Sequence, residues 1–273
     1  MPPKNCITVF LGHGTGDKKY GGTKQYSSTA LLSKYDYNFI TGPKHLQKLR
    51  DIGLEMPEEK LIKIGNLRFD RYVNREIDFD REYNRLGIVD RERKNILYAP
   101  TWEYGNGTFN TYFKRFAKIL TRQYNLIVRP HYHDRNKIVK SRLWARLNRI
   151  EHLYFSDPAE LVNDSMINDF VISDIMISDT SSILYEYLIT GKPIIIAAND
   201  YNDLHQMPDQ MNVVNYATIF DGSGDIEEIV AQELVEQKYR QDYKRLLESC
   251  FYFNDGKSIQ RVRDFVQSQS RPG

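Results

Sequence analysis

The 273-residue sequence predicts an α/β protein in which parallel strands alternate with helices. Two observations support this prediction. Five nearly continuous apolar runs of strand length lie between residues 95 and 198, with helix-length segments between them. Strands that are apolar along their whole length are typical of parallel sheets covered on both faces. A shorter series of the same kind precedes them, over residues 6–66.

The first unit is expected to contain three strands and two helices before a charged connector. The strands are residues 6–12, 37–42 and 61–66, and the helices are residues 27–34 and 43–52. Three strands are fewer than a complete nucleotide-binding domain has, so this unit is predicted to be shortened. The segment 71–95 is rich in Arg, Asp and Glu, which predicts a solvated connector with a helix.

The second unit is predicted to be a doubly wound parallel sheet of the Rossmann type. Its expected strands are residues 95–101, 125–131, 152–157, 174–179 and 193–198. Further helices are expected at 226–235 and 241–250. Nucleotides bind such domains beyond the carboxyl ends of the strands. The predicted domains are therefore residues 1–90, which include the connector, and residues 91–273.

Composition excludes several classes of protein. The net charge is +2, from 38 basic and 36 acidic residues, which does not favour a nucleic-acid partner. The two cysteines, Cys6 and Cys250, form neither a metal-ligand pattern nor a disulfide framework, as in a reducing cytoplasm. No apolar run approaches the ~20 residues of a membrane span, and the first residues do not resemble a signal peptide. We therefore expect a soluble cytoplasmic protein, with peripheral membrane contact left open.

The stretch "SDTSS", residues 178–182, lies where a parallel strand ends and a helix is predicted to begin. Hydroxyl side chains at such a place often cap the helix. The same place offers free backbone N–H groups to an anion, at the sheet edge where ligands bind. The favoured hypothesis is that Asp179, Thr180, Ser181 and Ser182 form a cradle for a diphosphate. Capping alone is the alternative.

Three other strand ends carry residues suited to related chemistry. His13 stands between glycines after the first strand, where its imidazole would be uncovered and able to act as a general base. Arg129 and His131 are suited to binding a phosphate group, because one guanidinium can donate to two phosphoryl oxygens at once. His131 and His133 also permit a metal site, but no further cluster of ligands supports one. Thr101 lies at the end of a third strand.

The segment 140–155 carries leucines and arginines on different helical faces. Leu143 and Leu147 lie on one face, and Arg142 and Arg146 lie on another. A basic amphipathic helix that also has a tryptophan can lie on an anionic membrane. Such a helix more often covers a sheet, so both alternatives stay open.

Six short motifs, taken in order, resemble the CDP-glycerol glycerophosphotransferase family, whose members build teichoic acids. They are "HGT" at 13–15, "GNLRFD" at 65–70, "ILYAPTW" at 96–102, His131, "SDTSSILYEYLITGKPII" at 178–195 and "FNDGKSIQRV" at 253–262. The resemblance implies two Rossmann-like halves facing a cleft, a GT-B-like fold, with the nucleotide held mainly by the second half. It also implies a metal-independent transferase without a cofactor.

The resemblance implies transfer of glycerol phosphate, or a similar polyol phosphate, from a CDP-linked donor to a polymer or lipid-linked acceptor. His13 is expected to be the general base on the acceptor hydroxyl, and His131 to contact the diphosphate. Residues 180–182 are expected to hold the diphosphate, and Glu186 the ribose. The resemblance places further residues in or near the cleft: Gly14, Thr15, Arg68, Asp70 and Thr101.

The sequence also departs from the family pattern. Leu67 replaces a proline, "GDKKYGG" replaces the usual continuation after "HGT", and only 12 residues precede that motif, where family members have many more. Two alternatives therefore stay open. One is a sugar-nucleotide enzyme similar to UDP-N-acetylglucosamine 2-epimerase, and the other is a non-catalytic nucleotide-binding module.

Overall fold

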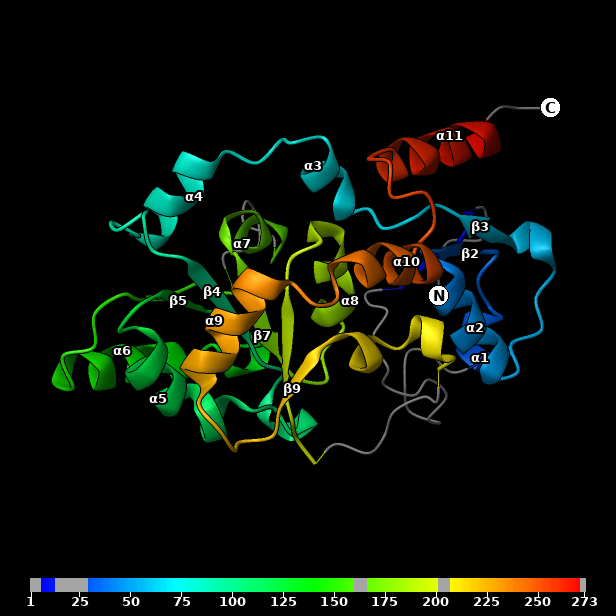
Figure 1. Cartoon of the computed structure of the whole chain (residues 1–273). Helices are drawn as coiled ribbons and strands as arrows, with labels where there is room; N and C mark the ends of the chain where they lie inside the picture. The colour runs from blue at the N-terminus through cyan, green and yellow to red at the C-terminus, as the bar shows by residue number, and fades with distance from the viewer. Residues whose placement is uncertain (1–5, 13–28, 160–165, 201–206, 271–273) are drawn as a thin grey trace.

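The computed structural model describes residues 6–12, 29–159, 166–200 and 207–270. Within these ranges the strands form two parallel sheets, one in each predicted unit (Figure 1). The first sheet has the order β1-β2-β3, with bounds Val9–Leu11, Tyr37–Ile40 and Leu61–Lys63. Both of its pairings are parallel, as predicted.

The second sheet is parallel throughout and has the order β6-β5-β4-β7-β8-β9. The bounds are β4 Asn95–Ala99, β5 Asn125–Val128, β6 Leu153–Phe155, β7 Ile175–Ser178, β8 Ile194–Ala197 and β9 Thr218–Phe220. Numbered along the chain, the order is 3-2-1-4-5-6, the doubly wound arrangement of dinucleotide-binding domains. The predicted fold class is confirmed, although β9 was not expected because it is short and partly exposed.

Helices and short 3₁₀ turns connect and cover the strands. The α-helices are α1 Thr29–Leu32, α2 Pro43–Asp51, α3 Phe69–Val73, α4 Phe79–Leu86, α5 Phe109–Leu120, α6 Lys137–Leu147, α7 Met166–Ile172, α8 Ile183–Tyr187, α9 Ile226–Glu236, α10 Arg240–Cys250 and α11 Ser258–Ser270. The 3₁₀ turns are η1 Glu58–Lys60, η2 Glu103–Gly105, η3 Tyr132–Asp134, η4 Leu188–Thr190, η5 Asp209–Met211 and η6 Val213–Tyr216.

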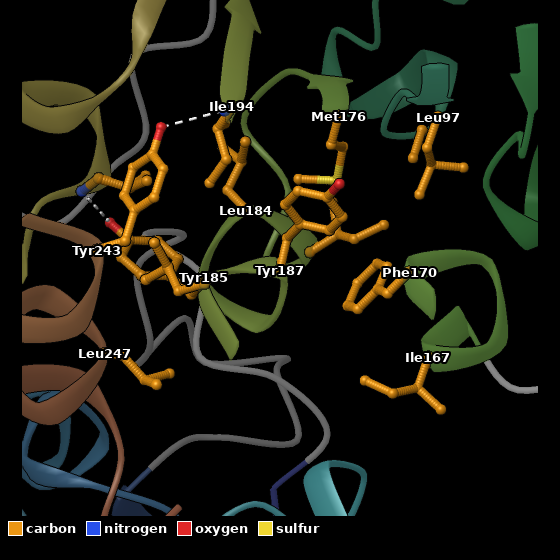
Figure 2. Packing of buried hydrophobic residues seen from close by; sticks show 14 of the residues in the cluster. Leu97, Ile167, Phe170, Met176, Leu184, Tyr185, Tyr187, Ile194, Tyr243 and Leu247 are labelled. Atoms are coloured by element: carbon orange, nitrogen blue, oxygen red, sulfur yellow. Dashed lines mark hydrogen bonds between the residues drawn. The ribbon is translucent and has the colours of Figure 1, made fainter. Parts of the chain in front are cut away.

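The core of the second unit has two layers, one on each face of the sheet. Strands β4, β5, β7 and β8 are buried along their whole length. Ile96 and Tyr98 pack with α5 and α9, whereas Leu97 packs with α7, α8 and α10, because successive side chains of a strand point to opposite faces. Figure 2 shows the second of these layers, where the Tyr243 hydroxyl accepts the backbone N–H of Ile194 at 3.1 Å.

The chain returns to the first unit through α10 and α11. Phe265 of α11 packs edge-on against Tyr37 and Phe39 of β2, with ring centroids 4.8 and 5.3 Å apart. At the end of α10, a Cβ on Gly42 would lie 1.9 Å from the carbonyl oxygen of Cys250, so only glycine fits. Helix α4 packs on α7, and α11 packs on α3, so contacts cross the predicted domain boundary between residues 90 and 91. That boundary stays a prediction.

A buried lysine joins the two units near the same place. Lys44 of α2 is fully buried, and its ammonium lies 3.2 Å from the centroid of the Tyr185 ring in α8. The ammonium also donates to the carbonyl oxygen of Met211 at 3.1 Å. A buried cation needs such partners, because it has lost its hydration. This contact fixes α2 against the second unit.

Asp70 has a different role from the one expected. The sequence predicts a cleft residue, but the side chain is only 4% exposed and lies at the start of α11. Its carboxylate accepts the backbone N–H groups of Ser258 at 3.0 Å and Ile259 at 2.7 Å. A carboxylate at a helix N-terminus satisfies free N–H groups and interacts favourably with the helix dipole. Asp70 is therefore a cap that holds α11 to α3.

We predict that Asp70→Ala lowers the free energy of unfolding by about 1–2 kcal/mol, because two helix N–H groups lose their acceptor. Urea denaturation measures this loss, and Asp70→Asn, which keeps one acceptor oxygen, should lose less. The affinity for a cytidine nucleotide should stay near the wild-type value in both variants. Weaker nucleotide binding with unchanged stability would instead show that Asp70 acts as a cleft residue.

His45 of α2 is a buried imidazole, only 2% exposed. Burial, together with the nearby Lys48 cation, lowers the pKa of His45 from 6.5 to about 4. Between pH 6.5 and 4, the unfolded chain therefore binds a proton on this imidazole that the folded protein does not bind. The stability linked to this group is fully present above pH 6.5 and is lost as the pH falls towards 4.

We predict that His45→Asn removes part of the acid sensitivity of the fold. The wild-type protein should lose roughly 3 kcal/mol more than the variant between pH 6.5 and 4, from a shift of that size. Urea denaturation at a series of pH values measures the difference. Parallel profiles for wild type and His45→Asn would show that His45 titrates normally.

Candidate functional site

The strand order of the second sheet reverses between β4 and β7, which pair directly. Ligands of open parallel sheets bind in the crevice outside such a reversal, at the carboxyl ends of the strands. Contacts link the loops that follow four strands there. Through them, Thr101, His131, Thr180 and Asn199 come into one region of the structure.

Asp179 joins the loops after β4 and β7. Its side chain has no exposure, and its two oxygens accept the backbone N–H of Thr101 at 2.9 and 3.1 Å. One oxygen also accepts the N–H and the hydroxyl of Thr108, at 2.9 and 3.0 Å. The sequence predicts a donor-binding residue here. The residue does lie at the site, but its carboxylate is occupied by protein donors, so it positions the loops instead.

The loop after β4 folds tightly over Asp179. A Cβ on Gly107 would lie 1.9 Å from the carbonyl oxygen of Thr101, so the loop closes only with glycine at this position. Thr101 is 3% exposed. The predicted cleft residue therefore contributes its backbone, and its side chain is buried beneath the site.

The hydroxyl residues after β7 are half-buried. Thr180 accepts a hydrogen bond from the Asn199 side-chain amide at 3.0 Å. Ser182 stands at the N-cap of α8, but its hydroxyl makes no capping hydrogen bond. Ser181 lies 3.5 Å from the N–H of Ile183, too long for a strong cap. Helix capping alone therefore does not account for these side chains, and the diphosphate cradle stays a prediction.

His131 follows β5 and lies beside aromatic rings. Its Nδ1 accepts the backbone N–H of His133 at 3.3 Å. The Trp102 ring lies 6.2 Å from the His131 ring and 5.1 Å from the His133 ring, measured between centroids. These contacts restrict the His131 ring at the carboxyl edge of the sheet, where the sequence places it.

Arg129 does not point to the site. Its guanidinium donates to Asp169 at 2.9 Å and to the Ser156 hydroxyl at 2.7 Å, and only 7% of the side chain is exposed. Arg85 binds the same carboxylate at 2.6 Å. The predicted contact of Arg129 with the donor is therefore corrected: the residue neutralises a buried carboxylate within the second unit.

Glu186 and Arg68 form an ion pair between the two units. Arg68 Nη1 lies 2.8 and 2.9 Å from the two Glu186 oxygens. The Glu186 side chain is 3% exposed and that of Arg68 is 46% exposed. The two predicted site residues therefore contact each other, and the Arg68 side chain stays partly exposed to solvent.

His13, Gly14 and Thr15 lie outside the described residues, so their predicted roles stay predictions. Among the described residues, no three His, Cys, Asp or Glu side chains gather as ligands for a metal ion. In the same part of the chain, a search for helices with the length and apolarity to cross a membrane found none.

Two residues of this region were not predicted, and a third, His133, was considered only as a metal ligand. Thr108 binds Asp179, and Asn199 bridges Thr180 and the carbonyl oxygen of Asn106, which it contacts at 2.9 Å. His133 is part of the aromatic cluster with Trp102. The only sequence signal for them is that each closely follows a predicted strand end.

Comparison with solved structures gives the fold. The wall teichoic acid polymerase TagF matches with a TM-score of 0.71 and 22% identity, over 98% of this chain and 69% of that chain. A TagF variant soaked with CDPG matches with a TM-score of 0.71 and 23% identity, over 97% of this chain and 67% of that chain. UDP-GlcNAc 2-epimerase from Neisseria meningitidis, bound to UDP-GlcNAc, matches with a TM-score of 0.57 and 14% identity, over 90% and 65%. The GT-B-like arrangement is confirmed.

Comparison with sequences gives the family. A search of curated proteins found no significant match. The family model described as CDP-Glycerol:Poly(glycerophosphate) glycerophosphotransferase matches residues 3–268, nearly the whole chain. This confirms the resemblance that six short motifs predict. The chain therefore belongs to the CDP-glycerol:poly(glycerophosphate) glycerophosphotransferase family of transferases.

Proposed function

We propose that the protein transfers glycerol phosphate from CDP-glycerol to a hydroxyl of a growing poly(glycerol phosphate) chain. Family membership supports the donor and the type of reaction. The observation that carries the assignment to this site is the convergence of His131 and residues 180–182 where the strand order reverses. A diphosphate fits there, because hydroxyls, an imidazole and helix N–H groups all donate to phosphate oxygens.

The reaction exchanges one P–O bond for another. The acceptor oxygen forms a bond to the phosphorus that carries glycerol. The bond from that phosphorus to the bridging oxygen breaks, and CMP leaves with the electron pair. His13 accepts the proton of the acceptor hydroxyl, since the pKa of an unperturbed imidazole lies near physiological pH. Positioning and charge stabilisation do the rest of the catalytic work.

His131 is proposed to donate to the departing phosphate. Its Nδ1 accepts the N–H of His133, so the neutral ring carries its proton on Nε2. That Nε2–H group can donate to an oxygen on which charge develops as CMP leaves. The neighbouring Trp102 and His133 rings limit the orientations of the imidazole.

The second unit is proposed to hold the rest of the nucleotide. The hydroxyls of Ser181 and Ser182 bind the diphosphate, and Thr180 orients the loop through Asn199. Glu186 accepts the ribose hydroxyls, which requires Arg68 to move partly away. Arg68 is exposed enough to do so and can then meet the glycerol phosphate as a cation.

We also propose that the acceptor is polymer or lipid-linked and that the protein works at the cytoplasmic face of a membrane. The family description supports a poly(glycerophosphate) acceptor. A polymer attached to a lipid would keep its growing end near the bilayer. Peripheral contact with that bilayer would therefore keep the protein close to its acceptor.

We predict that CDP-glycerol and CDP bind the purified protein in calorimetric titrations, whereas UDP and UDP-N-acetylglucosamine do not. His131→Ala should lower the rate of CMP release by about 10²–10³-fold, because a donor to the leaving group is lost. Its affinity for CDP-glycerol should fall much less. His133→Ala, in the same turn, should lower the rate much less than His131→Ala, because the His133 ring only limits the orientation of the His131 ring and its backbone N–H is kept. A preference for the uridine pair, or equal losses for both histidines, would contradict the assignment.

We predict that Ser181→Ala with Ser182→Ala weakens CDP-glycerol binding by at least about tenfold, since hydrogen bonds to charged groups contribute about 1.5–3 kcal/mol each. Thermal stability should hardly change, because Ser182 makes no capping bond. The buried Ser178, which donates to the Ala99 carbonyl at 2.6 Å, gives the contrast. Ser178→Ala should lower stability. A double variant that loses stability but keeps its affinity would favour capping alone.

A further inference from the structure

Three arginines follow one another along α3 and the turn after it. Arg68 is the N-cap residue of α3, Arg71 lies three positions further, and Arg75 lies just beyond the end of the helix. Residues three apart on a helix lie on the same side, with roughly 5–6 Å between their Cβ atoms. Helix α3 packs on α7 (Figure 1), so the three residues lie along the second unit. We call them the α3 arginine series.

Two members of the α3 arginine series carry a charge that no described residue neutralises. Arg71 donates from Nη1 to the side-chain oxygen of Asn168 at 3.3 Å, which is long for a hydrogen bond. Arg75 is exposed. Neither guanidinium forms an ion pair with any residue that the structure describes. Asp70, next to Arg71 in the chain, is occupied by the first N–H groups of α11.

The backbone of Arg75 is held in the left-handed region, with a φ of 56°. Side chains other than glycine seldom adopt this conformation, and it persists only where neighbouring contacts fix it. The N–H of Arg75 donates to the carbonyl oxygen of Tyr72 at 3.1 Å. The Asn74 amide donates to the carbonyl oxygen of Gly256 at 3.1 Å. Glycine would adopt the same backbone without strain, so the turn by itself gives no reason for an arginine.

Arg71 and Arg75 line a cavity of about 840 Å³ between this turn and the second unit. Its wall also contains apolar side chains from α3, α4 and α7. The other charges of the wall have partners: Lys192 donates to three backbone carbonyl oxygens, and Asp174 pairs with Lys94 at 3.0 Å. The volume lies in the range of pockets that enclose small ligands. The two guanidinium groups make this cavity suitable for an anion.

The α3 arginine series leads from the candidate site to this cavity. Ser173 and Asp174 line the cavity and precede β7, so the cavity lies towards the amino edge of the sheet. The candidate site lies beyond the carboxyl ends of the strands. Arg68, at the other end of the series, pairs with Glu186 at 2.8 Å and is 46% exposed. A long anion that extends from the site to the cavity would therefore meet the three guanidinium groups in turn.

We propose that the α3 arginine series binds the phosphates of the acceptor chain that precede its growing end. This inference rests on the proposed function, which places the transferred phosphate near Arg68. In a chain linked through the terminal carbons of glycerol, six bonds separate successive phosphorus atoms, a repeat of roughly 6–7 Å when extended. This repeat is close to the spacing of Arg68 and Arg71, and guanidinium groups bind phosphate oxygens through paired donors. A small anion in the cavity would not account for the arginines between the cavity and the site.

Calorimetric titration with synthetic poly(glycerol phosphate) fragments of one, two, four and six units tests the proposal without the reaction. The affinity of the wild type should rise up to about three units and then level off, and salt should weaken it. Arg71→Gln with Arg75→Gln should lower the affinity for the four-unit fragment by at least about tenfold, since two charged hydrogen-bond donors are lost. In turnover with CDP-glycerol, the same variant should raise KM for long acceptors and keep kcat near the wild-type value.

Two single variants separate binding from folding. Arg75→Gly removes the guanidinium and relieves the left-handed backbone, so it should weaken binding of the four-unit fragment without lowering the melting temperature. Arg122→Gln is the matched control. Arg122 is exposed, lies between α5 and β5, and forms no ion pair with a described residue. This variant should bind the fragments like the wild type.

Every variant should keep the wild-type affinity for CDP-glycerol, which is measured separately. Length-dependent binding of the fragments without binding of CDP-glycerol would support the α3 arginine series and count against the proposed reaction. Absence of fragment binding would overturn the present proposal, whether or not CDP-glycerol binds. Equal affinities for the one-unit and four-unit fragments would also overturn it, as would equal losses in Arg122→Gln and Arg75→Gly.

Discussion

The carboxylate of Asp179 has no exposure and lies where the strand order of the second sheet reverses. Backbone and hydroxyl donors from residues 101 and 108 surround it. A buried charge without these donors would cost several kcal/mol, so the loops after β4 and β7 are confined to conformations that supply them. Thr180 follows Asp179 directly in the sequence, and Trp102 follows Thr101, whose backbone N–H is bonded to Asp179. The groups proposed to meet the donor are thus held by a residue that lies beneath them.

Much of the architecture could be predicted, because apolar runs of strand length identify buried parallel strands and their ends identify the ligand edge. The place of a polar residue in the fold was easier to predict than the direction in which its side chain points. Arg129 lies at a strand end as expected, but its partner Asp169 is 40 positions away on α7 and turns it inward. Asp70 is 188 positions from Ser258, so no local pattern indicates that it caps a helix. Whether a polar side chain faces a ligand or the protein depends on such distant partners.

The same limit applies to helix faces. The spacing of α6 predicts different faces for leucines and arginines, but in the structure both kinds of side chain are exposed and neither face meets the sheet. Ser141 and Ala145 do so, because small side chains allow close packing, and the leucines are left outside. The remaining site residues were missed for a related reason. Asn199 and Thr108 act through loop geometry, which side-chain type alone does not predict.

The packing of α11 on the first sheet bears on the order in which the protein folds. Phe265 covers Tyr37 and Phe39, and the Tyr37 hydroxyl bonds Gln269, which is 232 positions further along the chain. Contacts between such distant segments form slowly, since a long loop must close first. On the ribosome, the first sheet emerges before α11 and keeps part of its apolar surface open until α11 arrives. The strands and helices of the second unit's core lie between them in the sequence and can pack sooner, so the first sheet reaches its native packing after residues that follow it in the chain.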